Sequence, residues 1–114
     1  MMLSTTHRLH DGLRVRLRFP YTTDRAAVLD LAGRAGVAVD DMEAHRLVRF
    51  DLRRRRVVCA AAWVDGAERL VGIAATSHDG DPTPEVLIAD EGRAPGVGHL
   101  LRAALVEQER QHVA

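Results

Sequence analysis

The segment from residue 84 to residue 105 constrains the chain more than any other part of the sequence. An apolar run, Val86–Ala89, ends at Asp90, and two closely spaced glycines, Gly96 and Gly98, precede a run rich in alanine and leucine. This order predicts a strand, a glycine-containing turn and the beginning of a helix. The first backbone N–H groups of a helix lack internal partners and lie at the positive end of the helix dipole, so such a turn is suited to bind phosphate.

The same turn differs from other phosphate-binding loops. A P-loop requires a lysine after its second glycine, and the sequence contains no lysine. A dinucleotide-binding fingerprint requires a third glycine where Leu101 stands. Arg93, three residues before Gly96, adds a permanent positive charge, so the pattern is Arg-x-x-Gly-x-Gly. The alternative interpretation is that Gly96 and Gly98 form a tight strand-to-helix turn without a ligand.

Length and composition predict one soluble domain. The chain has 114 residues, of which 46% are hydrophobic and 28% charged, and these values are typical of a globular protein. Its 16 basic and 16 acidic residues balance, so we expect neither nucleic acid nor a membrane as a partner. Cys59 is the one cysteine, which suits a reducing cytoplasm. We found no membrane-spanning run and no secretory signal, so the expected location is cytoplasmic.

Hydrophobic periodicity predicts the element order β-α-α-β-β-β-α in a domain over residues 13–114, with residues 1–12 as a loose tail. The charged run over residues 53–56 is expected to be a solvent-exposed connector, and Asp65-Gly66 a hairpin turn. The predicted elements are a strand over 13–19, a helix over 24–35, a helix over 40–50, strands over 57–64, 69–76 and 86–89, and a helix over 97–112.

With Arg93, Gly96 and Gly98 set in this order of elements, the chain resembles the GCN5-related N-acetyltransferase (GNAT) superfamily over about residues 13–112. The resemblance implies an α/β fold with αβα layers around a mixed, mostly antiparallel sheet. The family continues with a further strand, a helix and two more strands, so the expected fold is a C-terminally shortened form. Two departures lie in the turn: the spacing from Asp90 to Arg93 is one residue tighter than is common, and Pro95 is unusual there.

The resemblance also implies a ligand, which is acetyl-CoA or another acyl-CoA as cosubstrate. Its pyrophosphate would lie on the glycine turn and its pantetheine along the free edge of the strand over 86–89. Glu85 is the candidate catalytic base, with a solvated carboxylate as the alternative. The family's late tyrosine has no counterpart, because Tyr21 is the one tyrosine. The implied cofactor contacts are Ile88, Ala89, Asp90, Arg93, Ala94, Gly96, Val97, Gly98 and His99.

The expected function is therefore acyl-CoA binding, with N-acyltransferase activity when a second chain completes the cleft and little or none in the isolated monomer. Two alternatives remain: a non-catalytic regulatory or interaction module that keeps the half-fold, and a fragment of a longer acetyltransferase. Because the strand over 86–89 is expected at the sheet edge, we expect a homodimer or a partner chain to cover it.

The remaining polar and aromatic residues are expected to be structural. The six histidines include no His-x-x-x-His pair, so no metal site is expected. His99 is either a phosphate contact or a solvent-facing helix residue. Cys59 and Trp63 lie among apolar neighbours, which predicts that both belong to the core. The arginines of the first predicted strand are expected to form its polar face without a ligand; they are Arg14, Arg16 and Arg18.

Overall fold

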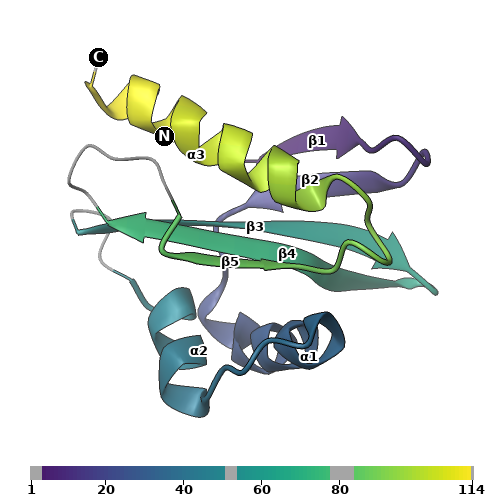
Figure 1. Cartoon of the computed structure of the whole chain (residues 1–114), viewed down its shortest axis with the longest axis horizontal. Coiled ribbons are helices and arrows are strands. Elements are labelled where there is room, and N and C mark those ends of the chain that lie inside the picture. Colours follow the sequence, from purple (N-terminus) through teal and green to yellow (C-terminus); the bar gives the residue numbers. More distant parts are fainter. Residues whose placement is uncertain (1–3, 51–53, 78–83, 114) are drawn as a thin grey trace.

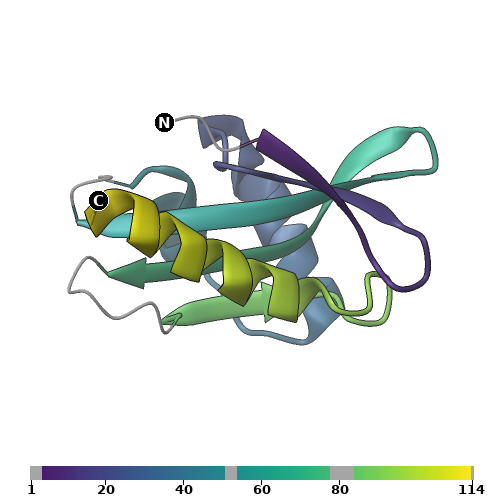
Figure 2. The ribbon, with the colours of Figure 1, turned by 90° about the horizontal axis from the view of Figure 1, so that it is seen from above.

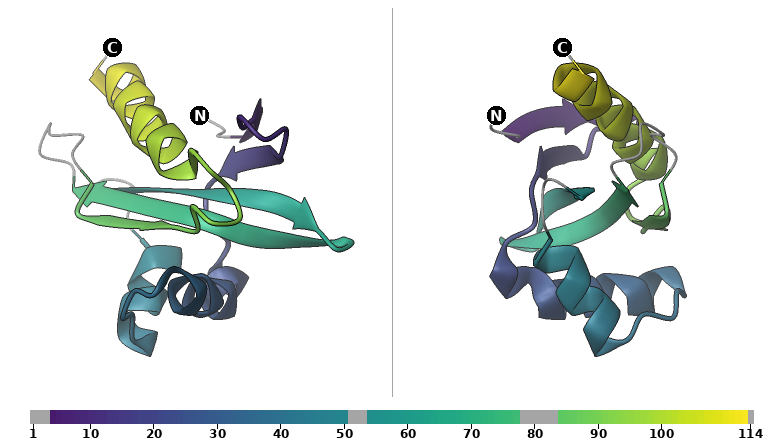
Figure 3. Two further views of the ribbon diagram at one scale, coloured as in Figure 1. Left: turned by 45° about the vertical axis from the view of Figure 1, so that its right-hand side comes forward. Right: turned by 90° about the vertical axis from the view of Figure 1, so that its left-hand side faces the viewer.

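One antiparallel sheet with helices on both faces makes up the computed structural model, which describes residues 4–50, 54–77 and 84–113. The strands lie in the order β1-β2-β3-β4-β5. Figures 1 and 3 show α1 and α2 on one face of the sheet and α3 on the other. The elements are β1 (Ser4–Arg8), β2 (Arg14–Arg18), the short 3₁₀ helix η1 (Thr22–Asp24), α1 (Arg25–Ala35), α2 (Asp41–Val48), β3 (Arg55–Val64), β4 (Ala67–Ser77), β5 (Val86–Ala89) and α3 (Val97–Val113).

The α/β class is confirmed, and two details of the predicted sheet change. Every described strand pairing is antiparallel, so the sheet is not mixed. Within the stretch predicted as a loose tail, Ser4–Arg8 form β1, which pairs with β2 through a turn closed by a hydrogen bond from the N–H of Leu9 to the carbonyl of Leu13 (2.9 Å). Hydrophobic periodicity could not reveal β1, because all five of its residues are polar.

Local signals fixed most element boundaries. Gly36 ends α1 at φ 72°, a left-handed conformation that favours glycine. The carboxylate of Asp40 accepts the N–H of Glu43 (2.8 Å) and begins α2. Asp65 and Gly66 have φ values of 52° and 80°, as a two-residue turn between β3 and β4 requires.

The charged run over 53–56 is not an exposed connector throughout, which corrects the prediction. Arg55 and Arg56 are the first residues of β3, and Arg56 is buried opposite Thr76 in the sheet. The pairing with β4 extends further than the apolar run, and this carries the arginines into the strand. Arg53 lies outside the described residues.

Two apolar layers hold the helices to the sheet. The layer under α1 and α2 contains Leu31, Leu47, Val57, Ile73 and Ile88, all buried. The layer under α3 is separate, and its members alternate along the strands with those of the first layer, as successive side chains of a strand do. Its buried leucines and valines are Leu9, Val15, Leu17, Val58, Val71, Val97, Leu101 and Leu105.

A glycine in β4 sets how closely α3 approaches the sheet. A Cβ on Gly72 would lie 2.6 Å from Leu101 Cδ1 and 3.2 Å from Val97 Cγ2. The register between β3 and β4 shifts next to it, since Ala60 pairs with Gly72 and Ala61 with Leu70. This bulge turns Val71 toward α3 as well. The first two turns of α3 therefore pack directly on the backbone of β4.

β5 lies at the edge of the sheet, as predicted. The N–H of Asp90 donates to the carbonyl of Val71 (2.9 Å), and the carbonyl oxygen of Ile88 lies 3.5 Å from where a Cβ on Gly72 would be. These groups therefore point toward β4. Because the direction alternates along a strand, the N–H and C=O groups of Leu87 and Ala89 point away from β4, toward the open edge.

The Gly72 contact gives a first test of the fold. We expect Gly72→Ala to lower the free energy of unfolding by about 1–3 kcal/mol, because the new methyl group would overlap Leu101, which is itself fully buried. Urea denaturation followed by circular dichroism measures the change. Gly33→Ala is the matched control: a Cβ on Gly33 in α1 meets nothing within 4 Å, and helix propensity favours alanine there. Equal stability of the Gly72→Ala variant and the unmodified chain would refute the close approach.

Candidate functional site

Asp90 organises the turn between β5 and α3. Its N–H donates to the carbonyl of Val71 in β4, as described above. Its carbonyl oxygen accepts the N–H groups of Arg93 (3.2 Å) and Ala94 (2.8 Å). Its carboxylate accepts the Arg93 N–H as well (3.2 Å). These bonds end β5 and fold residues 90–94 into a compact turn. The backbone and side chain of Asp90 are thus engaged in holding the turn.

Arg34, from α1, fixes Asp90 from the other side of the sheet. Its Nη1 lies 2.5 Å from Asp90 Oδ2, and its Nη2 donates to the carbonyl of Leu70 in β4 (2.8 Å). The side chains of Arg34 and Asp90 are 21% and 13% exposed, so the ion pair is largely shielded from water. Arg34 was not among the predicted site residues, because nothing local in the sequence relates it to a residue 56 positions away.

Glu91 covers the beginning of α3. The N–H of Gly96 donates to Glu91 Oε2 (3.0 Å), and Oε1 of the same carboxylate lies 3.4 Å from where a Cβ on Gly98 would be. A carboxylate of the chain itself therefore occupies the place at the helix N-terminus where an anionic ligand would bind. Glu91 was not among the predicted site residues, although a carboxylate five residues before the glycine is a visible signal in the sequence.

His10 is a second residue near the turn that the sequence did not point to. It lies in the turn between β1 and β2, and its ring carbon Cδ2 is 3.8 Å from where a Cβ on Gly96 would be. Gly96 has φ 92°, which a side chain rarely adopts, so glycine is required here for its backbone as well. An exposed imidazole thus stands beside the glycine turn.

The residues predicted to contact acyl-CoA differ in how deeply they are buried. Ile88, Ala94 and Val97 are buried in the two apolar layers, so only their backbone groups could meet a ligand. Arg93 and His99 are exposed next to the turn, while Ala89, Asp90 and Gly96 are partly buried and Gly98 is buried. The structure therefore brings the predicted contacts over 88–99 together at one end of β5.

Glu85, the candidate base, lies at the other end of β5. It is exposed, and its N–H donates to the carbonyl of Ala75 (2.8 Å). At about 3.3 Å per residue of strand, Glu85 is roughly 16 Å from Asp90. Any chemistry that joins Glu85 to the glycine turn would therefore need a ligand that runs along the whole edge of β5.

A second polar cluster lies around Arg18, and it corrects the prediction that this residue belongs to an exposed polar face. Arg18 is 5% exposed. Its guanidinium binds Asp24 and Glu68 (2.8 Å each) and lies 4.0 Å from the centre of the Tyr21 ring. Burial acts to lower the pKa of Arg18, but the hydrogen bonds to Asp24 and Glu68 outweigh it, so the pKa lies above its ordinary value. The cluster joins β2, η1 and β4, and its charges are satisfied internally.

Cys59 is buried, as predicted, next to this cluster. Its thiol donates to the carbonyl of Arg18 (3.4 Å). Burial raises the pKa of Cys59 to about 12. At neutral pH the side chain is therefore a protonated thiol and a poor nucleophile.

The Arg34–Asp90 pair generates a prediction about the turn. Arg34→Ala would leave a shielded carboxylate without its cation, so we expect the free energy of unfolding to fall by about 1–3 kcal/mol in urea denaturation. Arg25→Ala is the control, because Arg25 pairs with Asp41 on the surface, where the side chains are 52% and 73% exposed. Because that pair is exposed, its loss should lower the free energy of unfolding by only about 0–1 kcal/mol. Equal losses in the two variants would show that Arg34 does not hold the turn.

Cys59 generates a prediction about pH. Between its ordinary pKa of 9.0 and about 12, the folded chain keeps a proton that the unfolded chain releases. The free energy of unfolding should therefore fall as pH rises through this range. We expect Cys59→Ala to lose less stability than the unmodified chain between about pH 8 and about pH 10.5, as measured by urea denaturation. Parallel losses in both proteins would exclude the thiol as the cause.

Metal and membrane features are not found in the part of the chain that the structure describes. No three or more histidine, cysteine, aspartate or glutamate side chains gather there as a metal site would require. No described helix is both long enough and apolar enough to cross a bilayer. In comparisons with known proteins, no protein family and no curated protein matches the sequence.

Proposed function

We propose that the chain binds acyl-CoA, with acetyl-CoA as the simplest case, along the open edge of β5 and the glycine turn that follows it. In this proposal the fold is a GNAT-like half-domain. The observation that carries it is a juxtaposition: outward-facing backbone groups of Leu87 and Ala89 lead directly to the N-terminus of α3. The outward-facing backbone groups can pair with an extended amide chain, and the N-terminus of α3 can bind a pyrophosphate.

The pyrophosphate would bind at the N–H groups of Gly96, Gly98 and His99, with the exposed guanidinium of Arg93 beside it. Glu91 must leave first, because its carboxylate holds the Gly96 N–H. Glu91 is exposed, so its side chain can turn into solvent. Affinity then reflects a competition in which the ligand replaces one anion with another at the same N–H groups.

The pantetheine arm would add to the sheet as an extra strand. Its amide groups can pair with the N–H and C=O groups of Leu87 and Ala89, in the way that an extended peptide adds to a sheet edge. The side chains of Leu87 and Ala89 pack toward α3, and those of Val86 and Ile88 toward α1 and α2. Both helical layers therefore hold the edge strand rigid beneath the ligand.

Acyl transfer is the second step of the proposal, and it depends on more than the described residues. These supply one wall of a cleft, the edge of β5, with Glu85 exposed at its far end. A general base and an amine must be held together away from bulk water, which needs a second wall. We propose that another copy of the chain or a further segment provides it, in the cytoplasm, where acyl-CoA is available. The exposure of Glu85 favours the alternative, a module that binds acyl-CoA without turnover.

The binding site is tested by isothermal titration with acetyl-CoA. We expect Arg93→Ala to weaken binding about tenfold or more, as loss of a charge-assisted hydrogen bond does. Gly98→Leu should abolish binding, because its side chain would fill the space between Ala89 and Glu91. Glu91→Gln should strengthen binding, because the competing charge is removed. Arg49→Ala, exposed just after α2 on the other face of the sheet, is the control for net charge.

Two results would contradict the proposal. One is the absence of binding to the unmodified chain at about millimolar acetyl-CoA. The other is binding that Arg93→Ala and Arg49→Ala weaken equally. Turnover with a small amine, measured together with the oligomeric state, separates the alternatives: binding without turnover identifies the non-catalytic module, and turnover lost in Glu85→Gln identifies the enzyme.

A further inference from the structure

Trp63 is 70% exposed, which corrects the prediction that it belongs to the core. It lies in β3 next to the hairpin turn, and successive side chains of a strand alternate between faces, so it shares the α1–α2 face of the sheet with Cys59 and Ala61. The helices cover Cys59 and stop short of Trp63. The largest apolar side chain of the molecule therefore stands in solvent at the end of the sheet that no described helix covers.

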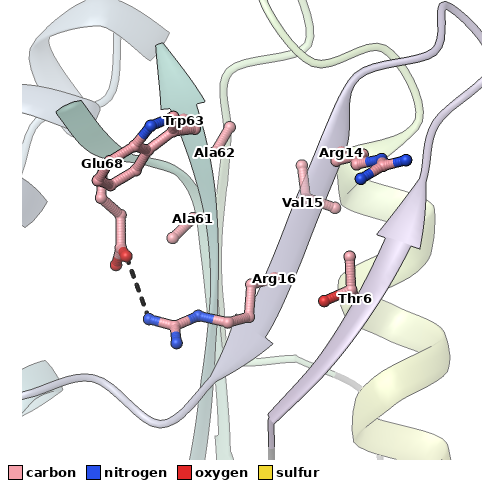
Figure 4. Close-up of a pocket in the computed structure, with 8 residues that line it drawn as sticks. All are labelled: Thr6, Arg14, Val15, Arg16, Ala61, Ala62, Trp63 and Glu68. Atoms are coloured by element: carbon pink, nitrogen blue, oxygen red, sulfur yellow. Dashed lines mark hydrogen bonds and ion pairs between the residues drawn. The ribbon is translucent and has the colours of Figure 1, made fainter. Parts of the chain in front are cut away.

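A hollow of about 160 Å³ lies beside Trp63, where the β1–β2 hairpin and the tip of the β3–β4 hairpin diverge (Figure 2). We call this hollow the fork; its main lining residues are Thr6, Arg14, Arg16, Ala61, Trp63 and Glu68. Figure 4 shows Trp63 and Glu68 on one side of it and Thr6, Arg14 and Arg16 on the other. The pairing of β2 with β3 ends at Val15 and Ala62, which leaves the space open.

The fork carries an excess of positive charge. Arg16 is neutralised by Glu68 (3.1 Å), but the same carboxylate also binds Arg18 (2.8 Å). Arg14 lies directly opposite Arg8 in the pairing of β1 with β2, and both are exposed. Within the described residues, neither of these two arginines has a carboxylate at ion-pair distance. Like charges that face each other across two strands are destabilising. A bound anion would remove this repulsion between Arg8 and Arg14.

We propose that the fork docks an acidic segment of another protein, whose apolar side chain packs on Trp63 and whose carboxylates pair with Arg14 and Arg8. Tryptophan and arginine are the residues that dominate binding energy at protein interfaces. Charge complementarity requires that the occupant be negative, and the exposed indole requires that it bring an apolar group. This surface lies on β1, β2, β3 and the beginning of β4, away from the edge of β5, so the inference does not rest on acyl-CoA binding.

The charges around the fork favour a protein segment over a nucleic acid. A polyanion needs a long basic track, whereas the chain as a whole has a net charge of zero. Asp11 and Asp65 lie in the turns of the two hairpins that form the fork, so its positive charge is local and suits a segment with one or two carboxylates better than a continuous polyanion. Trp63 is also the one tryptophan of the chain, and single-strand binding relies on several stacking platforms.

The test uses Trp63 emission from the full chain during titration with a short synthetic peptide in which one leucine is flanked by glutamates. We expect a saturable blue shift that weakens as salt is added. Arg14→Glu should weaken binding at least about tenfold, since it replaces an attraction by a repulsion. Arg69→Glu makes the same charge change on the opposite face of β4 and should change affinity less than about twofold. Circular dichroism verifies that both variants fold.

Five outcomes would overturn the proposal. The first is no change in emission at about millimolar peptide. The second is equal weakening by Arg14→Glu and Arg69→Glu, which would show general electrostatic attraction. The third is tighter binding of a single-stranded oligonucleotide than of the peptide at the same site. The fourth is a concentration-dependent blue shift without peptide, which would assign the fork to a second copy of the chain. Unchanged affinity of a labelled peptide for Trp63→Ala would also exclude the indole as the anchor.

Discussion

The contact between α3 and the backbone of β4 at Gly72 is the constraint on which the rest of the structure depends. Because this position has no side chain, Val97 and Leu101 reach the sheet itself. The beginning of α3 is thereby fixed against β4, and the turn that leads to it must leave β5 at Asp90. The position of the glycine turn at the sheet edge thus depends on Gly72, which lies about twenty positions earlier in the chain.

Arg34 and Asp90 extend this constraint through the thickness of the molecule. The pair joins α1, on one face, to the turn before α3, on the other, and the Leu70 carbonyl joins β4 to both. A displacement of either helical layer would therefore move the turn that carries the proposed phosphate site. Glu91, in contrast, is exposed, and its bond to the Gly96 N–H is separate from these contacts.

The parts of the fold that the sequence predicted are those with a local cause. Apolar periodicity, the Asp40 cap, the Gly36 terminus and the Asp65-Gly66 turn each act within a few residues, and each was located correctly. The errors have non-local causes. The strand pattern predicts that Arg18 is exposed, but in the folded chain it is buried and paired with Asp24 of η1 and Glu68 of β4. The apolar neighbours of Trp63 predict that it is buried, but the helices do not extend far enough along the sheet to cover it. The strand, turn and helix that carry the proposed site follow from local signals, whereas His10 and Arg34 come from distant segments and were missed. Glu91 was missed although its signal lies only five residues from Gly96.

The β3–β4 hairpin also has a consequence for how the chain folds. Its turn is two residues long, its strands are the longest of the sheet, and both apolar layers are built on its two faces. Such a hairpin closes a short loop, and its formation takes microseconds without help from distant segments. The helices and the three remaining strands can then add to this hairpin. A mutation that slows closure of this one turn would slow the folding of both layers together, whereas a change in α3 or β5 would act mainly on unfolding.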